Sequence, residues 1–220
     1  MIPIRDLNPS RRFAFVNLAI ILTCIAVWIY EITLPPPLLD AFIYTYGFVP
    51  AEFWERPWTL VTHMFLHGSW AHIIGNMLYL WVFGDNVEDR LGHLRYLVFY
   101  VLSGIGAAFM QAAVAFAFGN PYIPLIGASG AISGVLGAYM YYFPNARVLG
   151  LVPVFIFLIP VEWPAAVFIG LWFLYQIING ILFLPFVHMG GVAWFAHIGG
   201  FIIGYFLAQL WDDRRGGKID

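Results

Sequence analysis

The sequence predicts an all-α, polytopic membrane protein with six transmembrane helices and both termini in the cytoplasm. The first observation behind this prediction is composition: of 220 residues, 62% are hydrophobic and only 10% are charged. The mean hydropathy is +0.83, and these values together do not describe a water-soluble surface. The second is a series of charge-free runs close to the roughly 20 residues that cross a bilayer. The third is the distribution of positive charges along the chain.

Six charge-free runs qualify as membrane spans. The first follows two arginines and lacks a small-residue cleavage site, so we expect it to be retained and not removed as a signal peptide. Pro144 ends the fourth run, while Pro164 and Pro185 bracket the fifth. The runs leave little chain for anything else, so residues 1–220 are expected to form one membrane domain. The predicted spans are residues 13–30, 68–84, 96–118, 125–143, 165–184 and 192–211.

Two other segments are candidate membrane elements. Residues 148–161 are uncharged, but they number only 14 and contain Pro153 and Pro160. This is short for a span, and it favours an interfacial or re-entrant stretch. Residues 31–67, which include three consecutive prolines at 35–37, are expected to form a partly inserted loop on the outer side.

Positive charges distinguish six spans from seven. With six, only Arg56 lies outside, whereas a seventh span at 148–161 would reduce the asymmetry to six inside against four outside. Because short cytoplasmic loops carry an excess of Lys and Arg, six spans with both termini inside is the better topology. The nine inner cations would be Arg5, Arg11, Arg12, Arg90, Arg95, Arg147, Arg214, Arg215 and Lys218.

Several classes of function are disfavoured. Ten Lys and Arg against twelve Asp and Glu give a net charge of -2, so the chain has no basic face for nucleic acid. The one cysteine, Cys24, has no partner within the chain for a disulfide. His63 and His67 have the spacing of metal ligands on a helix, but the chain lacks an HExxH motif and cysteine ligands. We therefore expect neither a metal nor another cofactor.

Polar side chains inside spans are costly in lipid and tend to face a bundle interior or a functional cavity. In the predicted topology the second, fourth and sixth spans all run inward from the outer face. Each carries a polar residue four or five positions from its predicted start, which places these residues at one depth near that face. The polar residues of the spans are His72, Asn76, Ser129, Ser133, Gln176, Asn179 and His197.

Glycines predict that the fourth and sixth spans pack closely. Small residues at spacings of three and four let membrane helices approach backbone to backbone. On the sixth span His197 shares the face of the glycines, so Ser129 and His197 are expected to come within reach of each other. The glycines that we expect to form this packing are Gly130, Gly134, Gly200 and Gly204, with Gly127 and Gly137 continuing the pattern on the fourth span.

These neighbours indicate nucleophilic catalysis. A serine hydroxyl needs a base to take its proton, and His197 is a suitable base for Ser129. His72 and Asn76, which share a helix face, can donate hydrogen bonds to the oxyanion together with the free amides at the start of the serine helix. No Asp or Glu lies in the outer part of these spans, so we infer a Ser-His dyad and not a triad. Gln176 and Asn179 either line the cavity or join helices.

At these residues the chain resembles the rhomboid family of intramembrane serine proteases. The run from Gly127 to Gly130 is similar to the GxSG nucleophile motif, and Ala196-His197 with Gly200 and Gly204 resembles the histidine helix with its GxxxG. The histidines at 63, 67 and 72, followed by Asn76, resemble the spaced histidines of the family. The residues at 88, 90 and 92 resemble its ExRxG element, whose Glu88 and Arg90 are expected to form an ion pair.

The resemblance implies a six-helix rhomboid-like bundle that cleaves transmembrane segments of other membrane proteins near the outer face. Ser129 would be the nucleophile and His197 the base, with His72 and Asn76 around the oxyanion. The fifth span and residues 186–193 would gate and cap the site.

Two positions depart from the family pattern. Thr59 stands where many relatives carry arginine, so any stabilising role of that arginine is missing or is supplied elsewhere. Ser133 stands where some relatives carry a tyrosine against the histidine. Because ring stacking is then not available, the group that orients His197 is left open.

Two other functions stay open at this point. A proteolytically inactive relative would bind and escort membrane clients, although such relatives usually lack the serine or the histidine. A small transporter would also hold polar residues in the membrane, but it would favour paired repeats around the midplane. The expected partners are transmembrane substrates and the lipid bilayer. The expected location is a bacterial plasma membrane, because no transit peptide or additional span is evident.

Overall fold

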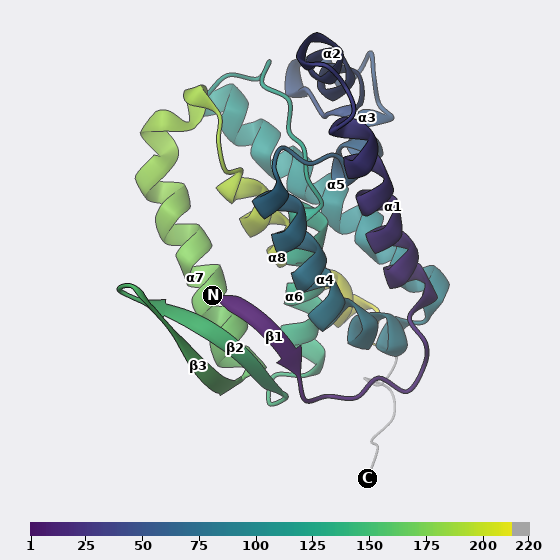
Figure 1. Ribbon diagram of the computed structural model, residues 1–220, viewed down its shortest axis with the longest axis vertical. Helices are drawn as coiled ribbons and strands as arrows, with labels where there is room; N and C mark the ends of the chain where they lie inside the picture. The colour runs from purple at the N-terminus through teal and green to yellow at the C-terminus, as the bar shows by residue number, and fades with distance from the viewer. Residues whose placement is uncertain (213–220) are drawn as a thin grey trace.

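The computed structural model describes residues 1–212, which fold into a mostly helical bundle with a small sheet against one side (Figure 1). Helices occupy all six predicted spans, with ends that differ by a few residues from the charge-free runs. The long helices are α1 (Phe15–Glu31), α4 (Trp70–Leu91), α5 (His93–Phe118), α6 (Ser129–Tyr142), α7 (Ala165–Phe183) and α8 (Trp194–Leu210).

The predicted outer loop contains several short helices at one end of the bundle (Figure 1). They hold the chain between α1 and α4 in a compact layer, and prolines begin two of them. These are α2 (Pro36–Tyr46), η1 (Pro50–Glu52), α3 (Thr59–Thr62) and η2 (His63–Phe65), and η3 (Leu184–Met189) follows α7.

By length and apolarity alone, some but not all of the predicted spans qualify as membrane-crossing helices. Within residues 1–212, two helical stretches are long and apolar enough to cross a membrane, His93–Phe118 and Ala165–Met189. Two further apolar helices are shorter, Phe15–Glu31 and Trp194–Leu210. The six-span count and the side of the termini therefore remain predictions. Arg214, Arg215 and Lys218, which enter the charge count, lie outside the described residues.

Helix α6 is the centre of the bundle. All of its residues from Gly130 to Tyr139 are buried, and it contacts α8, α5, α4 and α7. A helix that is apolar or small on every side is buried on every side. Figure 1 shows α6 and α8 in the middle, between α7 on one side and α1 on the other.

The prediction of an all-α fold is wrong in one respect, because the structure contains a three-stranded antiparallel sheet. It consists of β1 (Ile2–Asp6), β2 (Arg147–Val154) and β3 (Phe157–Pro164), in that spatial order. Residues 148–161, expected to be interfacial or re-entrant, form most of the β2–β3 hairpin. Their β-branched and aromatic residues favour strands, and the N-terminal strand, which no charge-free run marks, pairs with β2.

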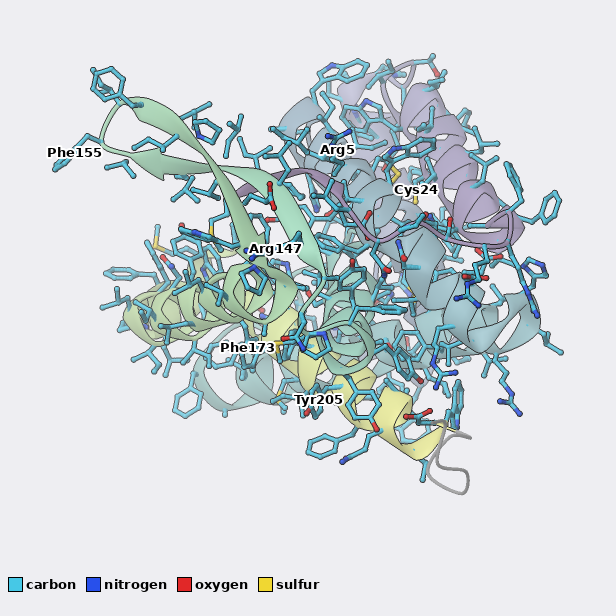
Figure 2. All side chains as sticks on the ribbon, turned by 90° about the horizontal axis from the view of Figure 1, so that it is seen from below. Arg5, Cys24, Arg147, Phe155, Phe173 and Tyr205 are labelled. Carbon is cyan, nitrogen blue, oxygen red and sulfur yellow. The ribbon has the colours of Figure 1, made fainter. Side chains whose placement is uncertain are left out.

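Proline positions explain why this hairpin is tolerated. A proline lacks the N–H that a central strand needs. Pro153 lies beyond Leu151, where pairing with β1 ends, and Pro160 lies on the edge strand β3. At the turn Phe155 has a φ of 53° and is 99% exposed. Figure 2 shows it at the tip of the hairpin, directed away from the helices.

Asp6 fastens the sheet to the bundle at the end of β1. Its carboxylate accepts hydrogen bonds from Tyr139 Oη at 2.5 Å and from Asn86 Nδ2 at 2.9 Å. Burial is the main cause that raises the pKa of Asp6 to about 6; the Tyr139 hydrogen bond opposes this rise and the nearby Asp85 adds to it.

The predicted ion pair between Glu88 and Arg90 is wrong. The Glu88 carboxylate accepts hydrogen bonds from the backbone N–H groups of Val16 at 3.0 Å and Asn17 at 2.6 Å. Arg90 instead pairs with Asp212 at the end of α8. A carboxylate is favoured at a helix start, where amides lack partners, so Glu88 caps α1 while Arg90 ties α4 to α8.

Candidate active site

Ser129 is the first residue of α6. The expectation that this helix begins near Leu125 is wrong, because residues 125–128 form a non-helical approach. Leu125 forms a β-bridge with Phe48, and Gly127 has a φ of 117°, a conformation that favours glycine and interrupts a helix. Ser129 therefore stands among the amides of the first turn, which have no helical carbonyl to bond.

The serine and the histidine meet at a helix crossing. His197 lies three residues after the start of α8, and its Nε2 is 2.8 Å from Ser129 Oγ. Both residues are half-buried. A hydroxyl at this distance from an imidazole nitrogen has the geometry from which the base can remove the proton.

Glycine backbones form the crossing of α6 and α8. A Cβ added at Gly200 would lie 2.0 Å from Gly130 O, and one at Gly204 would lie 2.2 Å from Gly134 O. These distances are far below ordinary van der Waals contact, so no side chain fits between the two helices here. The packing is backbone against backbone, as small residues permit in membrane helices, and it sets the separation of Ser129 and His197.

His72 and Asn76 lie on α4 beside the approach to the serine. Gly127 packs so closely on the His72 ring that a Cβ there would be 2.6 Å from His72 Nε2. His72 Nδ1 accepts a hydrogen bond from Gly68 N at 3.4 Å, so a neutral ring carries its proton on Nε2, the nitrogen nearest Gly127. Asn76 is buried, and its Nδ2 has no hydrogen-bond partner within residues 1–212. Both side chains thus present N–H donors near Ser129.

A cavity of about 750 Å³ connects these residues. The side chains of α4, α6, α7 and α8 that carry chemistry all face it: His72, Asn76, Ser129, Gln176 and His197.

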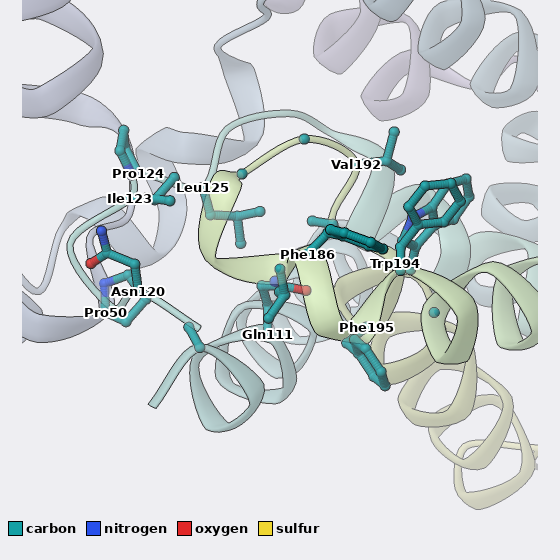
Figure 3. Close-up of a pocket in the computed structure, with 17 residues that line it drawn as sticks. Pro50, Gln111, Asn120, Ile123, Pro124, Leu125, Phe186, Val192, Trp194 and Phe195 are labelled. Carbon is teal, nitrogen blue, oxygen red and sulfur yellow. The ribbon is translucent and has the colours of Figure 1, made fainter. Parts of the chain in front are cut away.

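The segment after η3 forms one wall of this cavity. Residues 191–194 line it and also line a second cavity of about 350 Å³. Figure 3 shows this second cavity, with Gln111, Phe186 and Trp194 among its lining side chains. Part of the segment that was expected to cap the site, residues 191–193, therefore borders both cavities, and Gly190 and Gly191 within that segment have positive φ.

For Gln176 the sequence left two roles open, lining the cavity or joining helices. Its Oε1 lies 2.8 Å from His197 Nδ1, so it contacts the ring nitrogen that faces away from the serine. Ser133, the other polar residue near the nucleophile, donates its hydroxyl to the backbone oxygen of Ser129 at 2.6 Å. Spacing could show that Gln176 is inside a span, but not which helix it faces.

The family of the chain follows from comparison with known proteins. The family model described as the rhomboid domain matches residues 54–211. The chain belongs to the rhomboid family. Members of this family are integral membrane proteins, which agrees with the composition and the long apolar helices. The matched region contains Ser129, His197, His72 and Asn76.

Several relatives named as rhomboid proteases are similar to part of this chain. The rhomboid protease GlpG of Klebsiella pneumoniae subsp. pneumoniae is 34% identical over 125 residues, which is 56% of this chain and 41% of the relative. The rhomboid protease AarA of Providencia stuartii is 30% identical over 160 residues, covering 62% and 55%. The rhomboid protease GluP of Bacillus subtilis is 43% identical over 84 residues, covering 38% and 15%. The chain thus spans between 15% and 55% of the length of these relatives.

Proposed function

We propose that this rhomboid-family protein is an intramembrane serine endopeptidase that cleaves transmembrane segments of other membrane proteins. The observation that carries the proposal is the 2.8 Å contact between Ser129 Oγ and His197 Nε2 inside a cavity lined by four helices. A serine that serves only helix packing has no need of an imidazole base at this distance in such a cavity. The similarity to GlpG, AarA and GluP supports the same reading.

The proposed reaction begins with attack of Ser129 Oγ on the carbonyl carbon of a peptide bond, while the hydroxyl proton passes to His197 Nε2. His72 Nε2, Asn76 Nδ2 and the amides at the start of α6 donate to the resulting oxyanion. His197 then gives its proton to the departing amine, and the C–N bond breaks. Water, activated by the same histidine, hydrolyses the acyl ester and restores Ser129.

The proposed topology has six spans, both termini in the cytoplasm and the site near the outer face. Asp6 bonds Asn86, and Asp212 pairs with Arg90. Because Asn86 and Arg90 both lie near the end of α4, the first and last described parts of the chain meet at one end of the bundle. Ser129, at the start of α6, lies toward the other end. A substrate helix that reaches the site must be locally unwound, because a hydrogen-bonded helix hides its peptide bonds.

A bacterial plasma membrane remains a prediction for the location. Relatives include the bacterial GlpG and also rhomboid protein 1, mitochondrial, of Saccharomyces cerevisiae, which is 29% identical over 126 residues.

Cleavage by the purified protein tests the proposal. Full-length protein in detergent is incubated with a model transmembrane substrate, alongside Ser129→Ala and the matched control Ser133→Ala. We expect cleavage by the wild type and by Ser133→Ala, and a loss of at least about 10³-fold in Ser129→Ala. Cleavage that survives Ser129→Ala would overturn the assignment of the nucleophile. Binding of substrate without cleavage by the wild type would instead indicate a client-binding protein.

A further inference from the structure

Gln176 lies on α7 with 3% of its surface exposed, and it contacts His197 from the side opposite the serine. The two contacts of the ring have the same length: Nε2 to Ser129 Oγ is 2.8 Å, and Nδ1 to Gln176 Oε1 is 2.8 Å. The imidazole is therefore held between a hydroxyl from α6 and an amide from α7. A third helix thus contributes to the geometry of the serine and the histidine.

The orientation of the Gln176 amide follows from its second contact. Its Nε2 lies 3.3 Å from the backbone oxygen of Trp172, which can only accept a hydrogen bond. Exchange of the amide nitrogen and oxygen would place two acceptors against each other. The oxygen of Gln176 therefore faces His197, and since it can only accept, His197 Nδ1 must carry the proton. The lone pair of a neutral ring is then on Nε2, facing Ser129.

We propose that Gln176 is a positioning residue that holds His197 in the Nδ1–H tautomer and fixes the plane of its ring. In the other tautomer Nε2 would carry a proton and could not take one from Ser129. An acidic residue performs this task in many serine hydrolases. Here a neutral amide provides the acceptor without burying a charge between membrane helices, where a carboxylate is costly. The kinetic consequence rests on the proposed protease function, whereas the tautomer does not.

Within residues 1–212, no other side chain around the His197 ring replaces the hydrogen bond between His197 Nδ1 and Gln176. Trp172 and Trp194 flank His197 with ring centroids at 6.2 Å each, and such ring contacts do not select a tautomer. Ser133 uses its hydroxyl on the Ser129 carbonyl, so it does not reach His197. Because Ser133 replaces the tyrosine that lies against the histidine in some relatives, the group that orients His197 was left open. Gln176 on α7 takes that role in this proposal.

The first experiment determines which ring nitrogen of His197 carries the proton. Full-length protein labelled with ¹⁵N-histidine is studied by NMR in lipid or detergent, and the His197 signals are assigned by comparison with His197→Gln. We expect Nδ1 to be protonated in the wild type, and this pattern to be lost in Gln176→Leu. Gln176→Glu, which keeps an oxygen toward Nδ1 in either protonation state, should restore it.

Cleavage kinetics and labelling of Ser129 by a fluorophosphonate are the second measurement. We expect Gln176→Leu to lower kcat by roughly 10- to 100-fold with little change in KM, and Gln176→Glu to recover most of this loss. The matched control is Asn179→Leu, because within residues 1–212 the Asn179 amide on the same helix bonds only the Tyr175 carbonyl, at 2.8 Å. This control should retain wild-type kcat.

The outcomes separate this inference from the proposed function. An Nε2–H tautomer in the wild type overturns the role of Gln176 whether or not the protein cleaves anything. Equal kcat in Gln176→Leu and the wild type also overturns it, as does an equal fall in Asn179→Leu. A wild type that cleaves nothing, yet shows the Nδ1–H tautomer and loses it in Gln176→Leu, refutes the protease and supports the positioning contact.

Discussion

Gly200→Ala is the most direct test of how α6 and α8 set the distance between Ser129 and His197. The new Cβ would lie 2.0 Å from Gly130 O and 2.9 Å from Gly130 C. Both atoms belong to the backbone of a buried helix, so no flexible side chain can move aside. The helices themselves must separate.

The size of this separation can be worked out from the contact. Ordinary van der Waals contact begins at 3.4 Å, so the Cβ and the oxygen must part by about 1.4 Å. A movement of this size along the Ser129–His197 hydrogen bond, now 2.8 Å, would take it beyond the roughly 3.2 Å over which a base acts directly. Because misplacement by about 1 Å can cost on the order of 100-fold in rate, we expect a loss of at least that order. Overpacking should also destabilise the fold by roughly 1–3 kcal/mol.

The assay is cleavage of a transmembrane substrate in detergent, with thermal unfolding measured on the same samples. The control is Gly170→Ala on α7, where nothing lies within 4 Å of the added Cβ, and where alanine should favour the helix by up to about 1 kcal/mol. If Gly200→Ala cleaved at the wild-type rate and unfolded at the wild-type temperature, the crossing would not set the geometry of the site.

Three further outcomes are expected. Glu88→Gln should lower the free energy of unfolding by about 1–2 kcal/mol in denaturant or thermal unfolding, because the charged acceptor for the first amides of α1 is lost; an unchanged midpoint would contradict this. The raised pKa of Asp6, about 6, means that its contribution to stability is fully present below the unfolded pKa near 3.8 and is lost as the pH rises through 6. Asp6→Asn should therefore flatten this part of the pH–stability curve, and a wild-type curve that lacks the decline would refute the shift. Gly127→Ala should lose cleavage activity, because its φ of 117° disfavours a side chain and the Cβ would lie 2.6 Å from His72 Nε2; full activity would show that this approach is not needed.

The sequence was informative about features that depend on the type of a single residue, such as a polar side chain in lipid or a glycine at a helix contact. Polar groups are costly in a membrane, so Ser129, His197, His72 and Asn76 stood out from their surroundings. The glycine spacing pointed to the pairing of the two helices, because only small residues permit that approach. The helix positions followed from the bilayer thickness, which makes the charge-free runs long and countable.

The sequence was less informative where structure depends on contacts between distant segments. The β2–β3 hairpin looked like a short membrane stretch, since its apolar residues suit either structure and only pairing with β1 distinguishes them. Glu88 and Arg90 are two residues apart, and side chains at that spacing do not face each other on a helix. Glu88 instead bonds the first amides of α1, and Arg90 pairs with Asp212. The direction of Gln176 depended on the rotation of α7, which no local pattern specifies.

The glycine crossing has a consequence for how the specificity of such a protein can change. Side chains in most enzymes can be exchanged gradually around a nucleophile, with neighbours adjusting their rotamers to absorb each step. At Gly200 and Gly204 there are no side chains to exchange, since these residues of α8 rest directly on carbonyls of α6. Variation in the lining of the cavity must therefore arise away from these glycines, at α4, α7, residues 191–194 and side chains such as Ile126 and Ile132, while the glycine contacts keep Ser129 and His197 at the same spacing.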